Sequence, residues 1–313
     1  MIVRLSWPVV PTLMMMPNAP LLAVPNVSEG RDRAAIEAIA RAFTALGGPR
    51  LLDVHSDADH DRSVFTLAGE PRALSKALLA GARVAVERID VGAERDPAQG
   101  GQHPHVGAVD VMPVVYFDPG QRGAACAEAL VIADELGERL GVPVFLYGDL
   151  AGGRTRAELR RGGLRGLAER IGSGELRPDF GPARAHQTAG ATLVAAREPL
   201  VAFNLELAAP ASVADARRIA SLIREGGSEG LPGVRAIGVS LRGGSVGQVS
   251  TNVERPLEVP LRDVVEAVGK HAGVARAELV GLAPRAALEG FPTDVTLGDF
   301  DPALHVIENA LGF

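Results

Sequence analysis

Two histidines stand in a glycine-bounded stretch whose composition suits proton transfer. His103 and His105 flank Pro104, and the stretch leads directly into an apolar run, Val109 to Phe117. Proline fixes its own φ and disfavours helical backbone for the preceding residue, so His103 is expected in an extended loop. An imidazole titrates near neutral pH, and a positioned one can take up and return a proton within one reaction cycle. A pair of turn histidines without chemistry is the alternative.

A second polar cluster, Asp53 to Arg62, lies between two β-rich runs. Neutral imidazoles and a carboxylate that leave one position open for water make a hydrolytic metal site. The residues of such a site would be His55, Asp57, Asp59, His60 and His103. A strand, Ser63 to Leu67, follows where metal hydrolases with this spacing have a helix. We therefore expect a hydrogen-bonded loop and no metal, with a metal-dependent hydrolase as the less favoured alternative.

Arginines offer contacts for acidic ligands at two places. Arg62 stands at the entry to a predicted strand, where its guanidinium can hold a substrate carboxylate through two hydrogen bonds. An ion pair with the adjacent Asp61 is the alternative. The run from Arg154 to Arg170 contains six arginines. We interpret this run as a solvated helix face that is partly paired with glutamates, in preference to a site for a polyanion.

A small, polar, glycine-bounded segment begins at Gly181 and continues to Thr192. Backbone without bulky side chains can approach a flat ligand closely, so this segment is a candidate binding loop, with an interdomain linker as the alternative. Gly243 and Gly244 are expected in a hairpin turn. The sequence contains no Walker motif, dinucleotide fingerprint or serine-hydrolase elbow.

Composition narrows the class of protein. The chain has 313 residues and a net charge of −6 with both signs dispersed, so we expect two domains and no nucleic-acid partner. No apolar run is long enough to span a bilayer, so no membrane partner is expected. The single cysteine, Cys126, is expected in a helix as a small core residue. Residues 1–20 are a poor signal peptide and are expected to be a disordered extension, which predicts a cytoplasmic protein.

Strands and helices are expected to alternate in both halves of the chain. In the first half, we expect strands at 21–24, 51–54, 63–67, 109–117 and 142–147 and helices at 32–46, 71–89, 124–140 and 154–171. In the second half, we expect two strands within 192–207, a hairpin of 234–241 and 245–253, a strand at 277–282, and helices at 213–225 and 261–271. This pattern favours an α+β fold with helices on mixed sheets. Loop-forming residues place the domain boundary at 180/181, giving domains 21–180 and 181–313.

Several of these segments together resemble the glutamate formimidoyltransferase family. The opening Val24–Gly30, Val-Pro-Asn-Val-Ser-Glu-Gly, is similar to the family's Val-Pro-Asn-Phe-Ser-Glu-Gly. The stretch Gly101–Val111 is similar to its Gly-Glu-His-Pro-Arg-Met-Gly-Ala-Leu-Asp-Val block. Further matches follow in order at Leu51–Asp53, His60–Val64, Val142–Gly148, Pro178–Pro182, Val201–Asn204, Gln248–Asn252 and Leu279–Leu282. The resemblance covers about residues 21 to 290, and no cyclodeaminase domain is expected after it.

The resemblance implies two ferredoxin-like α+β subdomains, a ligand cleft between them and a homodimer. It also implies transfer of a formimidoyl group from N-formimidoyl-L-glutamate to N5 of tetrahydrofolate, a step of histidine degradation and one-carbon metabolism. Tetrahydrofolate would be an acceptor substrate, and no metal would be needed. The family's catalytic histidine falls on His103, which would serve as general base and acid. Its folate-binding segment falls on Gly181, Pro182, Ala183, Arg184, Ala185, His186, Gln187, Thr188, Ala189 and Gly190.

Four departures from the family pattern change the chemistry of these motifs. Gln102 replaces a glutamate, His105 an arginine, Ala189 a tryptophan and His55 an aspartate. The changes alter the charge beside His103 and remove a stacking surface. A divergent or non-catalytic folate-binding relative is therefore the alternative to an active transferase. Arg62 and Arg184 are the candidates for contact with substrate carboxylates.

Overall fold

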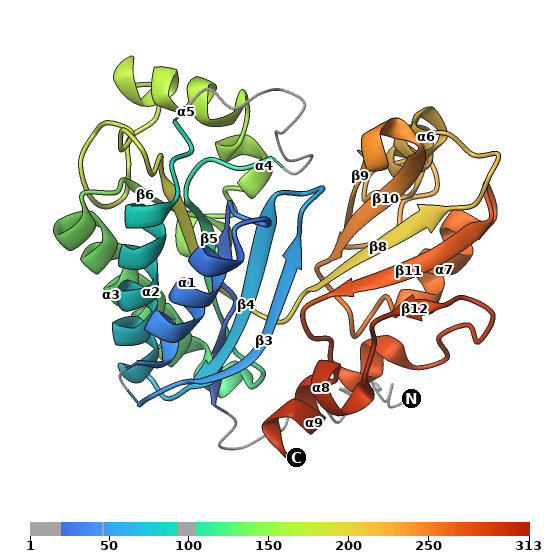
Figure 1. The fold of residues 1–313 in the computed structure, drawn as a ribbon, viewed down its shortest axis with the longest axis horizontal. Helices are drawn as coiled ribbons and strands as arrows, with labels where there is room; N and C mark the ends of the chain where they lie inside the picture. Colours follow the sequence, from blue (N-terminus) through green and yellow to red (C-terminus); the bar gives the residue numbers. More distant parts are fainter. Residues whose placement is uncertain (1–19, 46, 93–103) are drawn as a thin grey trace, which may run out of the picture.

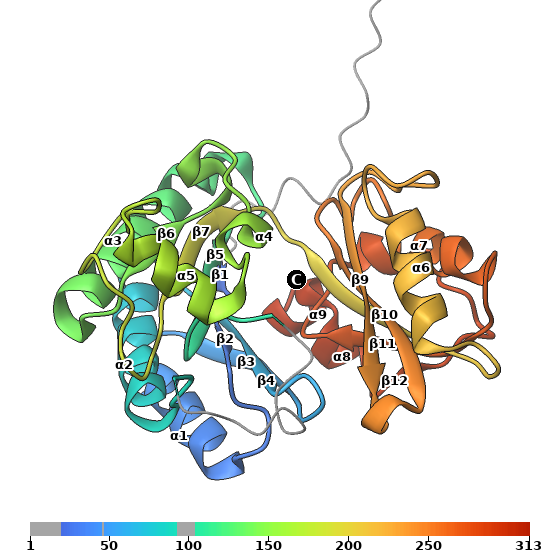
Figure 2. The ribbon, with the colours of Figure 1, turned by 90° about the horizontal axis from the view of Figure 1, so that it is seen from above.

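The computed structural model describes residues 20–45, 47–92 and 104–313, which form two β-sheets with helices on their outer sides. Figures 1 and 2 show the first sheet beside helices α1–α3 and the second beside α6 and α7, with the two sheets facing each other at the centre. The expectation of an α+β fold with helices on mixed sheets is confirmed.

The first sheet has seven strands in the order β1-β4-β2-β5-β7-β6, with β3 paired to β4 at one edge. Its strands are β1 (Leu21–Ala23), β2 (Asn26–Val27), β3 (Arg50–Asp57), β4 (Arg62–Gly69), β5 (Val109–Val115), β6 (Val144–Leu146) and β7 (Thr192–Arg197). Pairing among β1 to β5 is antiparallel, whereas β5, β7 and β6 are parallel. One sheet therefore joins a hairpin-rich half to a parallel half, and β5 lies at the junction.

Three helices cover the outer face of this sheet: α1 (Arg33–Thr44), α2 (Ala73–Arg88) and α3 (Arg122–Leu140). Helix α1 begins where its sequence predicts, because the Asp32 carboxylate accepts hydrogen bonds from the N–H groups of Ala34 and Ala35. Ile36, Ile39 and Phe43 lie on one face of α1 and are buried, as their spacing predicts. Cys126 lies in α3 and is partly buried against this core, as expected.

The arginine-rich segment is not one helix. It forms two, α4 (Arg156–Leu159) and α5 (Gly163–Gly172), which are separated at Gly162 and Gly163. Both glycines have positive φ, 79° and 62°, a conformation that side chains with a Cβ rarely adopt. The break gives α4 an orientation different from that of α5, so the arginines of α4 and of α5 have different surroundings.

The second sheet has five strands in the order β12-β11-β8-β10-β9. Its elements are β8 (Val201–Leu207), α6 (Val213–Ile223), β9 (Val234–Leu241), β10 (Val246–Val253), α7 (Leu261–Gly269), β11 (Val274–Val280) and β12 (Leu297–Gly298). Two short C-terminal helices, α8 (Pro302–His305) and α9 (Ile307–Leu311), return to the first sheet, where Ile307 packs with Leu22 and Val115. The expected hairpin around Gly243 and Gly244 is present as β9 and β10.

The chain changes from one sheet to the other between Arg197 and Val201. The two strands expected within 192–207 are present, but β7 pairs with β5 and β6 while β8 belongs to the second sheet. The first sheet therefore continues beyond the boundary expected at 180/181. The glycine- and proline-rich residues near that boundary instead form a surface connection from α5 to β7. None of the helices in the described ranges has the length and apolarity needed to cross a bilayer.

Phe65 on β4 tests the packing of the first sheet against its helices. Its ring is fully buried and meets Phe43 of α1 edge to face, with ring centroids 5.2 Å apart. Phe65→Ala is expected to lower the free energy of unfolding by about 3–5 kcal/mol, because it leaves a cavity between β4 and α1. Denaturant unfolding followed by circular dichroism measures the change. Val131→Ala, on the exposed face of α3, is the control and should change it by less than about 0.5 kcal/mol.

Candidate active site

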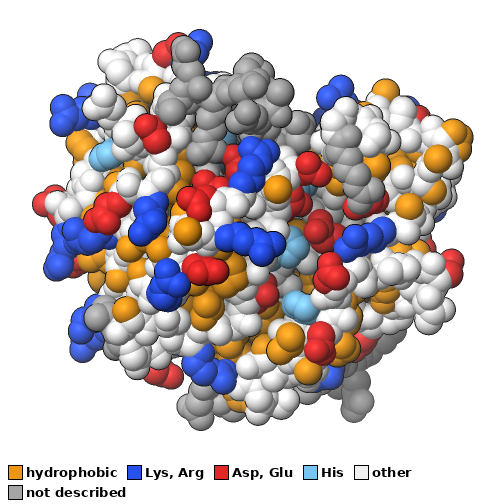
Figure 3. Space-filling model, in the orientation of Figure 1, with side chains coloured by type: hydrophobic (Ala, Val, Ile, Leu, Met, Phe, Trp, Pro, Cys, Tyr) orange, Lys and Arg blue, Asp and Glu red, His pale blue; other side chains and the backbone are white. Residues whose placement is uncertain are grey.

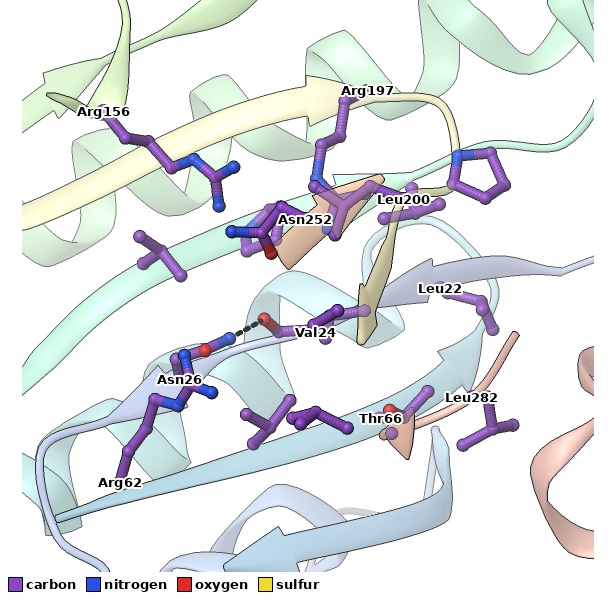
Figure 4. A pocket seen from close by; sticks show the side chains of 18 of the residues that line it. Leu22, Val24, Asn26, Arg62, Thr66, Arg156, Arg197, Leu200, Asn252 and Leu282 are labelled. Atoms are coloured by element: carbon purple, nitrogen blue, oxygen red, sulfur yellow. Dashed lines mark hydrogen bonds between the residues drawn. The ribbon is translucent and has the colours of Figure 1, made fainter. Parts of the chain in front are cut away.

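A pocket lies between the two sheets, on the face of the first sheet opposite α1–α3 (Figure 4). It encloses about 750 Å³ of empty space, part of it open to solvent. Side chains alternate between the faces of a strand, so every second residue of three neighbouring strands lines it. These residues are Leu22, Val24, Asn26, Arg62, Val64, Thr66, Val111, Pro113 and Val115. The second sheet contributes Ala202, Asn252 and Val280, and α9 contributes Ile307.

The pocket has an apolar floor and a cationic rim. Valine, leucine and proline side chains of β1, β4 and β5 form the floor, and four arginines also line the pocket: Arg62, Arg156, Arg160 and Arg197. Figure 3 shows charged and histidine side chains gathered along the seam between the two halves. An apolar surface with a few cations at its edge suits an elongated organic anion.

Asp110, at the start of β5, connects the histidine-bearing loop to this rim. Its side chain is buried, its Oδ1 accepts the Val106 N–H at 2.8 Å, and its Oδ2 pairs with Arg160. The backbone between Val106 and Asp110 is also held by Ser28, whose hydroxyl donates to the Gly107 carbonyl at 2.7 Å. The chain that leaves His103 is therefore fixed next to the arginines of the pocket.

His103 itself lies outside the described residues, as does Gln102. The described part of the loop begins at Pro104, which is exposed, and His105, which is half-buried. The role expected for His103 therefore stays a prediction. The support for this role is that Asp110 holds the backbone at Val106, three residues after His103.

Arg62 lines the pocket from the start of β4, as a residue that contacts substrate would (Figure 4). Burial lowers its pKa to about 10, and the positive charge of Arg160 acts in the same direction. The carboxylates of Asp110, Asp57 and Glu278 act in the opposite direction without restoring the usual value. Arg62 is thus a cation at neutral pH whose charge is incompletely compensated, and an anion bound in the pocket would compensate it.

The arginine-rich run was expected to face solvent, and the structure shows otherwise for two arginines in and directly after α4. Arg156 and Arg160 are one helical turn apart and both line the pocket. Arg161 fits the expectation, since it is exposed and pairs with Glu175 at 2.9 Å. In the sequence, the four-residue spacing of Arg156 and Arg160 indicates that their side chains share one face of a helix. Arg197, at the end of β7, had no comparable signal in the sequence, and it lines the pocket because β7 lies beside β5.

Two histidines of the metal alternative, His55 and His60, have partners on the second sheet. β3 and β4 form a hairpin here, and Asp57 Oδ1 accepts the backbone N–H of His60 at 2.8 Å. His55 Nε2 lies 3.6 Å from Glu278 Oε1 on β11, and His60 Nε2 lies 3.0 Å from Gln248 Oε1 on β10. Among the described residues no group of three histidine, cysteine or acidic side chains has the geometry of a metal site. These histidines instead connect the first sheet to the second.

The hairpin forms a second, polar cavity with β11 and the C-terminal segment, apart from the arginine pocket. Asp53 and His55 face Glu278 and His305 across it. Burial raises the pKa of Asp53, while the nearby His55 and His305 act in the opposite direction. Glu278 also accepts a hydrogen bond from the Asn204 amide at 2.9 Å. The His55 that departs from the family pattern therefore has a carboxylate neighbour on the second sheet.

The segment 181–190 lies against the end of the histidine-bearing loop and does not line the arginine pocket. Ala108 N–H donates to the Ala189 carbonyl at 2.9 Å, and Gly107 forms a bridge with Gly190. A Cβ on Gly107 would meet the Ala191 carbonyl oxygen at 1.9 Å, so this contact requires glycine. Arg184 is exposed. Whether this segment binds folate stays a prediction, but it is adjacent to the backbone that follows His103.

Comparison with known proteins gives a consistent set of relatives. A family model described as the formiminotransferase domain, N-terminal subdomain, matches residues 21–197, a range that ends with β7. The glutamate formimidoyltransferase of Streptococcus pyogenes serotype M1 is 34% identical over 297 residues, which cover 92% of this chain and 97% of that protein. The glutamate formimidoyltransferase of Thermoplasma acidophilum is 34% identical over 275 residues, which cover 85% and 88%.

Larger relatives contain an additional region. The formimidoyltransferase-cyclodeaminase of Gallus gallus is 37% identical over 278 residues, which cover 85% of this chain but 50% of that protein. The chain therefore spans about half the length of this bifunctional relative.

The incomplete compensation of Arg62 can be tested without knowing the reaction. Because the pKa of Arg62 falls on folding to about 10, its charged form opposes folding below that pH, and the opposition is lost as the pH rises through about 10. Arg62→Met should therefore leave the unliganded protein at least as stable as wild type at pH 7. A dicarboxylate such as glutarate should stabilise the wild type by about 1.4 kcal/mol at ten times its Kd, and the variant much less.

Thermal unfolding with and without glutarate measures both effects. Arg161→Met removes an exposed arginine outside the pocket and should keep the full stabilisation. Equal stabilisation of the wild type and Arg62→Met by glutarate would contradict a role for Arg62 in anion binding.

Proposed function

Because the chain belongs to the formiminotransferase family, we propose that it transfers the formimidoyl group of N-formimidoyl-L-glutamate to N5 of tetrahydrofolate, in histidine degradation. The observation that carries this proposal is the 34% identity to the streptococcal enzyme over 92% of the chain. The cationic pocket supports it, because both substrates are carboxylates. Tetrahydrofolate is then an acceptor substrate that is consumed in each cycle.

We propose His103 as the group that moves the proton. N5 of tetrahydrofolate attacks the amidine carbon of the donor and forms a tetrahedral intermediate. His103 accepts the N5 proton and returns it to the glutamate nitrogen, whose bond to the amidine carbon then breaks. The products are 5-formimidoyltetrahydrofolate and glutamate, with no net change in protons. One imidazole in both roles contributes about 10²–10⁴-fold to the rate.

We propose Arg62 as the contact for a carboxylate of N-formimidoylglutamate. It lies at the end of the pocket where Asp110 fixes the backbone after His103. Asp110 also pairs with Arg160 and so holds Arg160 in place, whereas Arg62 is partly buried and interacts with Asp110, Asp57 and Glu278. A carboxylate bound between β4 and α4 would bring the amidine close to the loop that carries His103.

We propose that residues 181–190 bind the pterin end of tetrahydrofolate beside that loop. Their contacts with Gly107 and Ala108 support this assignment. The topology supports two ferredoxin-like subdomains with the ligand cleft between them. Each sheet contains a β-α-β-β-α-β unit in which the fourth, first, third and second strands lie side by side. In the first sheet these strands are β5, β1–β2, β4 and β3. In the second sheet they are β11, β8, β10 and β9.

Other expectations from the family stay proposals. We propose a cytoplasmic homodimer that acts on small molecules without a metal and without nucleic-acid or membrane partners. The acidic net charge of −6 supports the expectation of no nucleic-acid partner. A folate-binding protein without transferase activity is the alternative, and His55, Gln102, His105 and Ala189 are the residues that would distinguish it from the family.

A steady-state assay with both substrates tests the transferase and its base. His103→Ala should lower kcat by about 10²–10⁴-fold while tetrahydrofolate binding is retained. His271→Ala, which removes a histidine paired with Glu229 outside the pocket, should leave kcat unchanged. Tetrahydrofolate binding without turnover in the wild type would favour the non-catalytic alternative. Unchanged kcat in His103→Ala would rule out His103 as the base.

The assignment of Arg62 makes a separate kinetic prediction. Arg62→Lys keeps a positive charge but loses the planar, two-pronged donor, so KM for N-formimidoylglutamate should rise about tenfold or more. KM for tetrahydrofolate should change by less than about twofold. A larger effect on the folate KM would assign Arg62 to the other substrate. Arg161→Lys, at an exposed arginine just after α4, is the matched control.

A further inference from the structure

A second group of cationic side chains lies on the far side of the arginine pocket from Arg62. Arg156 of α4 and Arg197 of β7 both line the pocket, and Figure 4 shows them with Asn252 of β10 across from Arg62. Strands β2 and β5 lie between β4 and β7. Arg197 pairs with Val115 at the end of β5, whereas Arg62 lies level with the start of β5. We call Arg156, Arg197 and Asn252 the distal cluster.

Arg197 has more donor capacity than its protein neighbours use. One of its terminal nitrogens donates to the Glu198 carbonyl at 2.9 Å. Its Nε is buried and has no hydrogen-bond acceptor among the described residues. Burial lowers the pKa of Arg197 to about 10, Tyr147 acts in the opposite direction, and the like charge of Arg156 adds to the lowering. Glu254 acts on both arginines, since it raises the pKa of Arg197 and lies 3.5 Å from Arg156, but it leaves the buried Nε of Arg197 without an acceptor in the described part of the chain.

Arg156 is also incompletely neutralised. Its terminal nitrogen lies 3.5 Å from Glu254, but Glu254 is shared with Arg235, whose Nε lies 3.3 Å away. The guanidinium of Arg156 lies over the ring of Tyr147, 5.8 Å from its centroid, which fixes its direction. The distal cluster thus offers two positioned guanidinium groups, with the amide of Asn252 from the second sheet beside them.

We infer that the distal cluster is a second carboxylate subsite and that it binds the glutamyl carboxylates of tetrahydrofolate. This inference rests on the proposed function and names the part of the acceptor that these residues recognise. Tetrahydrofolate is elongated, with the pterin at one end and the glutamyl group at the other. With the pterin beside the loop that carries His103, its aromatic middle lies along Val111, Pro113 and Val115, and its carboxylates reach Arg156 and Arg197.

The arrangement separates the two acidic substrates. Arg62 and Arg160 are on the side of the pocket near Asp110 and the histidine-bearing loop, where the donor must place its amidine. The two substrates differ in length: tetrahydrofolate carries its glutamyl carboxylates far from N5, whereas N-formimidoylglutamate carries its carboxylates close to the reacting carbon.

The test compares tetrahydrofolate with tetrahydropteroate, which lacks the glutamyl group, by anaerobic titration calorimetry on the full chain without donor. Arg156→Gln and Arg197→Met should each raise the Kd of tetrahydrofolate about 10–100-fold, the loss of a charge-assisted hydrogen bond. The Kd of tetrahydropteroate should change by less than twofold. Arg235→Gln is the matched control, since Arg235 also contacts Glu254 but lies outside the pocket and should affect neither ligand.

Each other outcome has a distinct meaning. Equal weakening of both ligands, or no weakening in either variant, overturns the distal subsite while leaving the transferase proposal intact. A rise confined to the KM of N-formimidoylglutamate assigns the cluster to the donor and also overturns it. A wild type that binds neither ligand overturns the proposed function together with this inference. Because Arg156 and Arg197 lie on different elements, a folding defect in one variant would not explain weaker binding in both. Near-ultraviolet circular dichroism shows whether each variant keeps the native fold.

Discussion

The buried carboxylate of Asp110 is the interaction on which the arrangement of the site depends. One oxygen accepts a hydrogen bond from the Val106 backbone N–H, and the other pairs with Arg160 at the C-terminus of α4. It therefore fixes both the exit of the histidine-bearing loop and one cation of the pocket rim. A buried carboxylate is tolerated only when its charge is met, and here a cation and a backbone donor meet it. Asp110 therefore connects this loop directly to Arg160, while Ser28 and Ala189 hold the same backbone from other sides.

The pocket is held open by two sheets that each have their own core. The outer face of each sheet packs against helices, in two separate clusters of buried residues. The inner faces are thus left to line the pocket and to connect through polar pairs such as His55 with Glu278 and His60 with Gln248. The inner face of the first sheet also packs apolar side chains, in one cluster with α4 and α5 and in another with Leu282 and Ile307. Members of both clusters line the pocket together with the arginines.

Much of the local structure was predictable because it depends on neighbours in sequence. The Asp32 cap, the buried face of α1 and the hairpin of β9 and β10 all follow from side chains within a few residues of one another. The arginine-rich segment shows the limit of such reasoning. A helix was expected across 154–171, but Gly162 and Gly163 divide it, and Arg156 and Arg160 line the pocket beside β5. The pair Gly162 and Gly163 can be read from the sequence, but the positive φ angles of these two glycines cannot.

The sequence by itself determined the α+β class, most of the elements, Arg62 as a pocket residue and, through the order of its motifs, the family. Only the tertiary structure decided that β7 completes the first sheet, that Arg197 thereby faces the pocket, and that His55 and His60 bind across to the second sheet. The physical reason is the distance along the sequence over which each kind of interaction acts. Periodicity and capping act over a few residues, whereas strand order and facing sheets bring together side chains separated by 100 residues or more, such as Arg62 and Arg197.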